Sequence, residues 1–263
     1  MLLISLSVVA GWLWNCKRKS NTVKVSRTNQ QKIAILIVDD HQLLRNGLSR
    51  MLADESDIVV MTGLSNGEAA LNFMIQRIQD SRRLPDIILM GARMPGIGGI
   101  EATRLILNVA PGTRIIAMSS ISFGLIPTQM LNAGAVSFVS KTTGINEMLK
   151  AIHMVHGGSH YISAETAVQL ATDPFNSEGK ALFEKLSHRE FQIAQMLADG
   201  YKVGEIAGFL HINAKIVYSY RYRIFAKLGV QNDVEMAVMA AEFGLADSVT
   251  ATGNFAAFDR VSA

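Results

Sequence analysis

The 263-residue chain has one cysteine, five prolines and few aromatic residues (7%). A single cysteine, Cys16, cannot form an internal disulfide, so the sequence favours a reducing compartment, and we expect a cytoplasmic protein. The formal net charge is only +3, which is too small to indicate nucleic-acid binding unless the cations cluster locally. Hydrophobic residues make up 49% of the chain. That share supports packed cores and excludes a largely disordered protein, and the length predicts two domains.

The apolar N-terminal stretch, Met1 to Trp14, is shorter than the roughly 20 residues that a membrane-spanning helix needs. Its positive charges, Lys17-Arg18-Lys19, follow the apolar run, whereas a secretory signal carries them before it. Three interpretations of residues 1–32 stay open: a translated upstream region without function, a weak membrane or partner anchor, or an unusual signal. We expect this extension to lie outside the fold and expect no membrane partner.

The most informative stretch runs from Asp86 to Ile100. Ile87 to Met90 is apolar without polar alternation, as expected for a strand that is covered on both faces. The run ends at Gly91, and a turn around Pro95-Gly96 leads into an apolar pattern of helical spacing. Strand, loop and helix in this order form half of a βαβ unit. Because ligands of parallel sheets bind outside the carboxyl ends of strands, Gly91 occupies a position where a functional side chain is expected.

Residues 33–158 alternate between strand-like apolar runs and amphipathic helical stretches. This alternation requires crossover connections and hence a parallel sheet, for which the flavodoxin-like strand order 2-1-3-4-5 is the expected solution. The predicted strands are Ile33 to Val38, Ile58 to Met61, Ile87 to Met90, Ile115 to Met118 and Ala135 to Val139. The predicted helices are Leu43 to Ala53, Glu68 to Ile78, Ile100 to Val109, Leu125 to Ala133 and Ile145 to Val155.

The predicted carboxyl ends of the strands bring polar side chains to one edge of this sheet. Asp39 and Asp40 follow the first strand, Ser119 ends the fourth, and Lys141 follows the fifth. Paired carboxylates suit a hard cation such as Mg²⁺, and an ammonium opposite a hydroxyl suits phosphoryl oxygens. Taken alone, the two aspartates equally well cap the following helix. Their convergence with the other two residues favours a binding site.

The stretch from Leu89 to Gly99 resembles the phosphoacceptor loop of bacterial response-regulator receiver domains, Leu-Met-Asp-x-x-Met-Pro-Gly. The matching residues are Leu89, Met90, Met94, Pro95, Gly96 and Gly99, and Gly91 stands where those domains have the aspartate that accepts the phosphoryl group. The resemblance covers about residues 33–158. It implies that Asp39 and Asp40 are metal-binding acids, that Ser119 and Phe138 are the switch residues, and that Lys141 contacts phosphate.

The loss of the aspartate at Gly91 removes both a nucleophile and a metal ligand. We therefore expect Mg²⁺ binding to be weak or absent, no other cofactor, and no phosphorylation in the usual way. We also hypothesise that Arg93, two residues further on, is a cation of this pocket that pairs with Asp39 or Asp40. An arginine directed into solvent is the alternative interpretation.

The second half of the chain has a helical pattern. Residues 159–185 are interpreted as a linker that contains one short helix and the turn-rich stretch Thr172 to Gly179. Ser187 and Glu190 form a capping box at the start of a helix. The further predicted helices are Val203 to Leu210, Ala214 to Leu228, which Asn213 can cap, and Asp233 to Phe243. Two short helices followed by a longer basic one match the helix-turn-helix arrangement.

Local charge supports this interpretation, since no Asp or Glu occurs between Ile206 and Asn232. Cations of one helix can neutralise phosphates, and polar side chains near its start can reach base edges. A solvated basic face is the alternative. The predicted DNA-binding residues are Lys215, Tyr218, Ser219, Arg221, Tyr222, Arg223 and Lys227.

Leu186-Ser-x-Arg-Glu190 and Lys227-Leu-Gly-Val230 resemble the LuxR-type output domain of NarL/FixJ-class response regulators, and Ser219 to Arg223 is more narrowly similar to GacA/UvrY-type regulators. The resemblance implies a transcriptional regulator rather than an enzyme. It also implies double-stranded DNA and a sensor histidine kinase as partners, and a homodimer on DNA. The domains are expected at 33–158 and 186–245, with a disordered tail at 246–263.

The recognition helix departs from the resemblance at its start. The family usually has Ser-Pro-x-Thr-Val where this chain has Asn213 to Val217, so that Ile216 lacks a hydroxyl that could contact phosphate, and Tyr218 replaces a smaller polar residue. Two alternatives to a transcriptional regulator therefore stay open. One is a phosphorylation-independent interaction module or decoy, and the other is a decayed relative without function.

Overall fold

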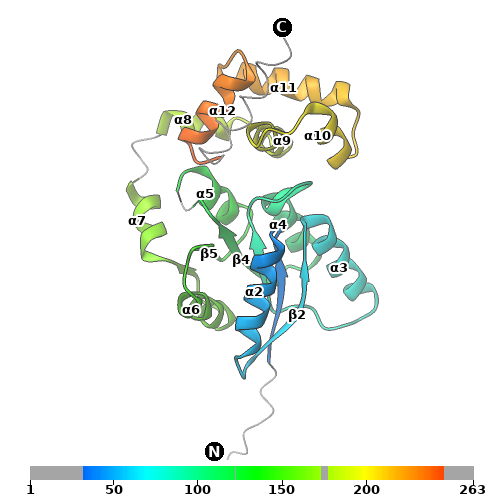
Figure 1. Cartoon of the computed structure of the whole chain (residues 1–263), viewed down its shortest axis with the longest axis vertical. Coiled ribbons are helices and arrows are strands. Elements are labelled where there is room, and N and C mark those ends of the chain that lie inside the picture. The colour runs from blue at the N-terminus through cyan, green and yellow to red at the C-terminus, as the bar shows by residue number, and fades with distance from the viewer. Residues whose placement is uncertain (1–31, 122, 173–176, 246–263) are drawn as a thin grey trace, which may run out of the picture. The chain divides into compact units, whose positions relative to one another are not determined.

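The structure, a computed structural model, describes residues 32–121, 123–172 and 177–245 (Figure 1). These residues belong to one compact unit that begins at Lys32. The predictions made for the N-terminal extension, for residues 173–176 of the linker and for the C-terminal tail lie outside the described residues. Within the described part, no helix combines the length and the apolar character needed to cross a membrane.

The first half of the described chain forms a parallel sheet in the order β2-β1-β3-β4-β5-β6. Its strands are β1 (Ile33–Val38), β2 (Ile58–Leu64), β3 (Ile87–Gly91), β4 (Arg114–Ser119), β5 (Ser137–Ser140) and β6 (Tyr161–Ile162). The predicted flavodoxin-like order is confirmed for the first five strands. A sixth strand is added at the edge, and its two residues are too few to give a pattern in the sequence.

Helices cover both faces of this sheet, which is why every residue of β1 and β3 is buried. Alternate side chains of each strand enter different cores: Leu36 and Ile88 face one side, whereas Ile35 and Leu89 face the other. The first core contains α3 (Gly67–Gln79), α4 (Gly98–Val109) and α5 (Leu125–Asn132), and the second contains α2 (Gln42–Ala53) and α6 (Ile145–His156).

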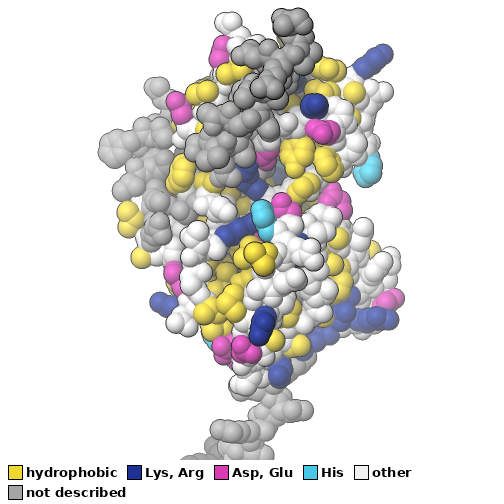
Figure 2. Space-filling model, viewed as in Figure 1, with side chains coloured by type: hydrophobic (Ala, Val, Ile, Leu, Met, Phe, Trp, Pro, Cys, Tyr) yellow, Lys and Arg dark blue, Asp and Glu magenta, His cyan; other side chains and the backbone are white. Residues whose placement is uncertain are grey.

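The start of α4 packs directly on the end of β3. A Cβ atom at Gly99 would lie 1.9 Å from the carbonyl oxygen of Gly91, so only glycine permits this approach. The contact fixes the β3–α4 loop, residues 92–97, at the carboxyl edge of the sheet. On the opposite face, α2 buries Leu48 and Leu52 but leaves Leu43 87% exposed, and Figure 2 shows hydrophobic side chains gathered over this helix.

The second half of the described chain is helical. Its helices are α7 (Ala164–Thr172), α8 (Ser177–Glu184), α9 (His188–Ala198), α10 (Val203–Phe209), α11 (Ala214–Leu228) and α12 (Asp233–Glu242). The predicted capping box is confirmed: Ser187 Oγ accepts from the Glu190 N–H at 3.3 Å, and Glu190 Oε2 accepts from the Ser187 N–H at 2.8 Å. Asn213 caps α11 as predicted.

Helix α8 lies within the predicted linker, residues 159–185, and begins inside its turn-rich stretch, Thr172 to Gly179. Its Phe183 is 1% exposed, and the ring packs against Phe243 with centroids 5.8 Å apart. Burial of a phenylalanine side chain stabilises the fold by about 2 kcal/mol, so tertiary packing rather than local pattern accounts for this helix.

Candidate functional site

Asp39 is the buried centre of the carboxyl edge of the sheet, with 0% exposure directly after β1. Its Oδ1 accepts a hydrogen bond from the His41 N–H at 2.9 Å. Its Oδ2 lies 2.7 Å from Nζ of Lys141, which follows β5, as an ion pair without hydrogen-bond alignment. A buried carboxylate requires a partner of opposite charge, and Lys141 is that partner.

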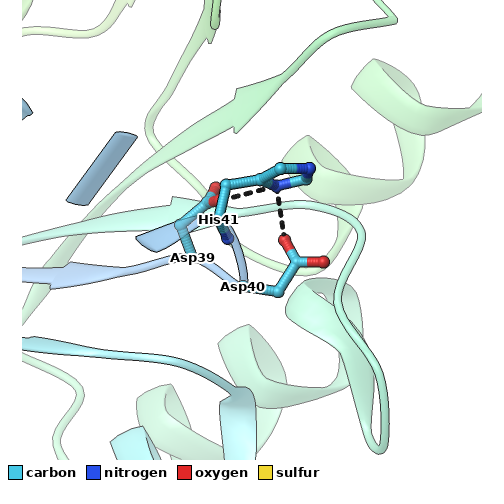
Figure 3. A group of neighbouring side chains, drawn as sticks. All are labelled: Asp39, Asp40 and His41. Carbon is cyan, nitrogen blue, oxygen red and sulfur yellow. Dashed lines mark hydrogen bonds and ion pairs between the residues drawn. The ribbon is translucent and has the colours of Figure 1, made fainter. Parts of the chain in front are cut away.

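His41 lies between the two aspartates (Figure 3). Its Nδ1 is 3.1 Å from Asp39 Oδ1 and 2.8 Å from Asp40 Oδ1. One ligand atom from each of the three residues lies within 4.8 Å of the others. The cluster therefore offers two carboxylates and an imidazole at the predicted metal position, although Lys141 already neutralises Asp39.

Gly91 ends β3 beside the Asp39 side chain. A Cβ atom added to Gly91 would lie 2.6 Å from Asp39 Oδ2 and 3.3 Å from the Val38 carbonyl oxygen. The first distance is too short for any real side chain. The Asp39 carboxylate thus takes up the space that a side chain at position 91 would need.

Ser119 and Phe138 complete the predicted set. Ser119 is 3% exposed at the end of β4, where its Oγ accepts from the Ile121 N–H at 3.0 Å and its carbonyl accepts from the Lys141 N–H at 2.8 Å. Phe138 is fully buried in the core. The structure thus brings Asp39, Asp40, Gly91, Ser119 and Lys141 together at one edge, while Phe138 packs in the interior.

A cavity of about 240 Å³ borders this edge. Its lining combines residues of the sheet edge and the β3–α4 loop with residues of α9 and the turn after it. The polar and aromatic members are Asp40, His41, Arg93, Ser119, Ser120, Lys141, Gln192, Gln195, Asp199 and Tyr201. Burial and the charges of Asp199 and Asp40 raise the pKa of Tyr201. No local signal in the sequence indicated Gln192, Asp199 or Tyr201, because they reach the cavity through tertiary packing alone.

Arg93 lines this cavity, but the predicted pairing with Asp39 or Asp40 is wrong. Its guanidinium forms an ion pair with Asp199 at the end of α9. Among the residues that the structure describes, Asp39 is paired with Lys141 and His41, and Asp40 with His41. The Lys141 ammonium therefore supplies the counter-charge of Asp39, and the His41 ring is the partner of Asp40.

The exposed face of α11 carries five of the predicted DNA-binding residues. Tyr218 is 56% and Tyr222 78% exposed, and Lys215, Ser219 and Arg223 are exposed beside them. Spacings of three and four residues place these side chains on one face of the helix. The Arg223 guanidinium lies 4.5 Å from the centroid of the Tyr220 ring, a cation–π arrangement.

The Arg223 Nε also lies 4.0 Å from Oε1 of Glu190, and the other two predicted cations of α11 form closer ion pairs within the helical half of the chain. Arg221 binds Asp233 of α12 in a bidentate manner at 2.8 and 2.5 Å, and these hydrogen bonds raise the pKa of Arg221. Lys227 Nζ lies 2.6 Å from Oε2 of Glu190, whose side chain is 3% exposed. Burial alone would raise the pKa of Glu190, but the hydrogen bonds from Lys227 and Ser187 outweigh it and lower that pKa.

The geometry thus defines a receiver-type sheet joined to a helix-turn-helix unit. Residues 35–153 match the family described as the response regulator receiver domain, and residues 184–240 match the bacterial regulatory proteins of the luxR family. The chain belongs to the two-component response regulators that combine a receiver with a LuxR-type DNA-binding domain. Regulators of this kind are generally not enzymes.

Individual relatives match across both halves. The chain is 40% identical to the response regulator GacA of Pseudomonas aeruginosa over 220 residues, which are 83% of this chain and 100% of GacA. It is 37% identical to the response regulator UvrY of Escherichia coli K12 over 219 residues, 83% of this chain and 98% of UvrY. The solved structure of the RcsB response regulator of Salmonella typhimurium matches with a TM-score of 0.62 at 21% identity, over 81% of this chain and 99% of RcsB, which shows the shared fold.

Proposed function

We propose that this chain is a DNA-binding transcriptional regulator whose receiver takes up no phosphoryl group and catalyses no reaction. The observation that carries the proposal is the glycine at the end of β3, where even a Cβ atom would lie 2.6 Å from Asp39 Oδ2. Phosphoryl transfer requires an oxygen nucleophile in line with the donor. Gly91 offers none, and the nearest carboxylate is buried and paired with Lys141.

The same residues argue against a tight Mg²⁺ site. Receiver domains bind Mg²⁺ at the phosphorylation site, and this ion requires several oxygen ligands in near-octahedral geometry. Here Gly91 supplies no ligand, and Oδ2 of Asp39 faces the Lys141 ammonium. In this proposal Lys141 supplies the positive charge that the metal would otherwise bring, and Mg²⁺ binding is weak or absent.

For the output domain, which we place at residues 186–245 after a receiver at 33–158, we propose that α11 is the recognition helix. Lys215, Tyr218 and Ser219 lie near its start, where side chains reach base edges. Tyr222 and Arg223 then face the DNA backbone. Arg221 and Lys227 hold α11 against α12 and α9 through their ion pairs. We further propose that the protein is cytoplasmic and binds DNA as a homodimer. In the receiver, Ser119, Phe138 and Lys141 are retained switch positions. A sensor kinase is a partner that no longer phosphorylates this receiver.

The test combines phosphorylation with DNA binding. The full chain is incubated with acetyl phosphate and Mg²⁺, with P. aeruginosa GacA as a positive control, and both are analysed by mass spectrometry. We expect label on the control only, and no effect of the donor on the affinity of this chain for duplex DNA. A labelled chain would contradict the proposal. Equal affinity for a relative's operator and for random duplex would favour an interaction module or decoy.

A further inference from the structure

The loop that follows Gly91 contacts the output domain directly. Arg93 pairs with Asp199, and these side chains are only 18% and 20% exposed. Beside this pair, Nε2 of the buried Gln192 donates a hydrogen bond to the Gly96 carbonyl oxygen at 3.0 Å. Both contacts join the β3–α4 loop to α9.

A second contact joins the start of α5 to the end of α12. The Leu125 N–H donates to the Phe243 carbonyl oxygen at 2.9 Å. A Cβ atom at Gly124, whose φ is +72°, would lie 2.2 Å from that same oxygen, and one at Gly244 would lie 2.7 Å from the Phe123 carbonyl oxygen. The two backbones therefore meet without a side chain between them, which only glycines allow.

These contacts leave the proposed DNA-binding face uncovered. They use α9 and the residues that follow α12, whereas Tyr218 and Tyr222 of α11 are 56% and 78% exposed with the receiver in place. Lys215 and Arg223 are exposed in the same arrangement. Separation of the two domains is therefore not required to free this face of α11.

We propose that the β3–α4 loop is a permanent dock for α9, and that the docked chain is the form that binds DNA. This inference rests on the proposed function and specifies its regulation. In a receiver with a phosphoacceptor, the conformation of this loop changes with phosphorylation. In this chain the loop follows Gly91, which cannot be phosphorylated, so no such change is expected. The same loop is thus available for a fixed contact through Arg93 and Gly96.

The test uses full-length Arg93→Asp, Asp199→Arg and the double variant that exchanges the two charges. Hydrogen exchange at the Leu125 amide reports on the dock, because this amide donates across it. We expect each single variant to speed this exchange about tenfold and the double variant to restore protection. Arg82→Asp is the matched control: Arg82 pairs with Asp80 at the surface of the receiver, and its loss should leave the Leu125 amide unchanged.

The second part of the test measures the effect of duplex DNA on this exchange and the affinity of the variant for DNA. Saturating duplex should leave exchange at Leu125 unchanged, and Arg93→Asp should bind duplex within about threefold of the wild-type affinity. Faster exchange on DNA addition, or binding by Arg93→Asp that is tenfold tighter, would overturn the proposal because docking would then oppose DNA binding. Unaltered exchange in both single variants would also overturn it. Exchange measured without DNA tests the dock even if the chain binds no DNA or accepts a phosphoryl group, so the two proposals fail separately.

Discussion

The substitution Gly91→Asp most directly tests the proposal that this receiver lacks a phosphoacceptor and a tight Mg²⁺ site because of Gly91. The new Cβ would lie 2.6 Å from Asp39 Oδ2, so the Asp39 carboxylate has to shift, and we expect the shift to weaken its ion pair with Lys141. The site would then hold three carboxylates close to Lys141 and His41. Arg93 is not the obstacle, since its guanidinium is paired with Asp199.

The size of the effect follows from the buried ion pair. Breaking such a pair costs about 3–5 kcal/mol, and part of this is recovered because the new carboxylate can itself pair with Lys141. We expect a net loss of about 2–3 kcal/mol in the free energy of unfolding without metal. Three carboxylates form an oxygen ligand set for Mg²⁺, and an ion present at 100 times its Kd returns about 2.7 kcal/mol. Mg²⁺ should therefore restore most of the lost stability.

The free energy of unfolding is measured by urea titration followed by circular dichroism, once with Mg²⁺ and once with EDTA. Gly91→Asn is the matched control, because it has the same size without the charge and should lose stability without recovering it. The Gly91→Asp variant should also become slowly phosphorylated by acetyl phosphate in the presence of Mg²⁺. If wild type gained as much stability from Mg²⁺ as the variant, or if the variant were indifferent to Mg²⁺, the assignment of Gly91 would be refuted.

Three further outcomes follow from the ion pairs. Lys141→Met leaves the buried Asp39 without its cation and should lower the free energy of unfolding by about 3 kcal/mol in urea titrations. Lys227→Ala should cost about 2 kcal/mol by the same measurement, since it leaves the buried Glu190 with only the longer ion pair to Arg223 at 4.0 Å. The lowered pKa of Glu190 means that its stabilising contribution is present above the ordinary value of 4.5 and is lost as the pH falls through the folded value. Glu190→Gln should therefore flatten the acid limb of the stability–pH curve below pH 4.5.

The sequence was sufficient for the receiver sheet because its pattern there is unambiguous. An unbroken apolar run such as Ile33–Val38, set between helical patterns, is typical of a strand that is covered on both faces, and the burial of all six residues of β1 agrees. The two-residue β6 and helix α8 were missed for the opposite reason. Pairing with β5 defines β6, and burial of Phe183 accompanies α8, so neither element is specified by local periodicity.

Within the site, the residues could be predicted from the sequence, but their partners could not. Asp39, Ser119 and Lys141 were predicted to share one edge from strand order alone, and the structure places them there. The partner of Arg93 could not be predicted, because Asp199 lies 106 residues away in the chain. Local proximity to Gly91 suggested Asp39, whose charge Lys141 already balances.

For the basic helix α11, too, the ion-pair partners could not be predicted from the sequence. These partners change the expected salt dependence of DNA binding. The window from Ile206 to Asn232 contains no acid, yet Asp233, which directly follows it, pairs with Arg221, and Glu190 of α9 pairs with Lys227. Lys215 and Arg223 remain as the exposed cations of this helix; Arg223 lies at the longer distance of 4.0 Å from Oε1 of Glu190, and its side chain is 53% exposed. Each phosphate contact contributes about 0.9 to the slope of log K against log salt concentration, so each chain should contribute about 1.8 rather than about 3.6. Removing the Arg223 guanidinium with Arg223→Ala should lower that slope by about 0.9, whereas Lys227→Ala should leave it unchanged; the reverse pattern in a salt titration would show that the ion pairs open on DNA.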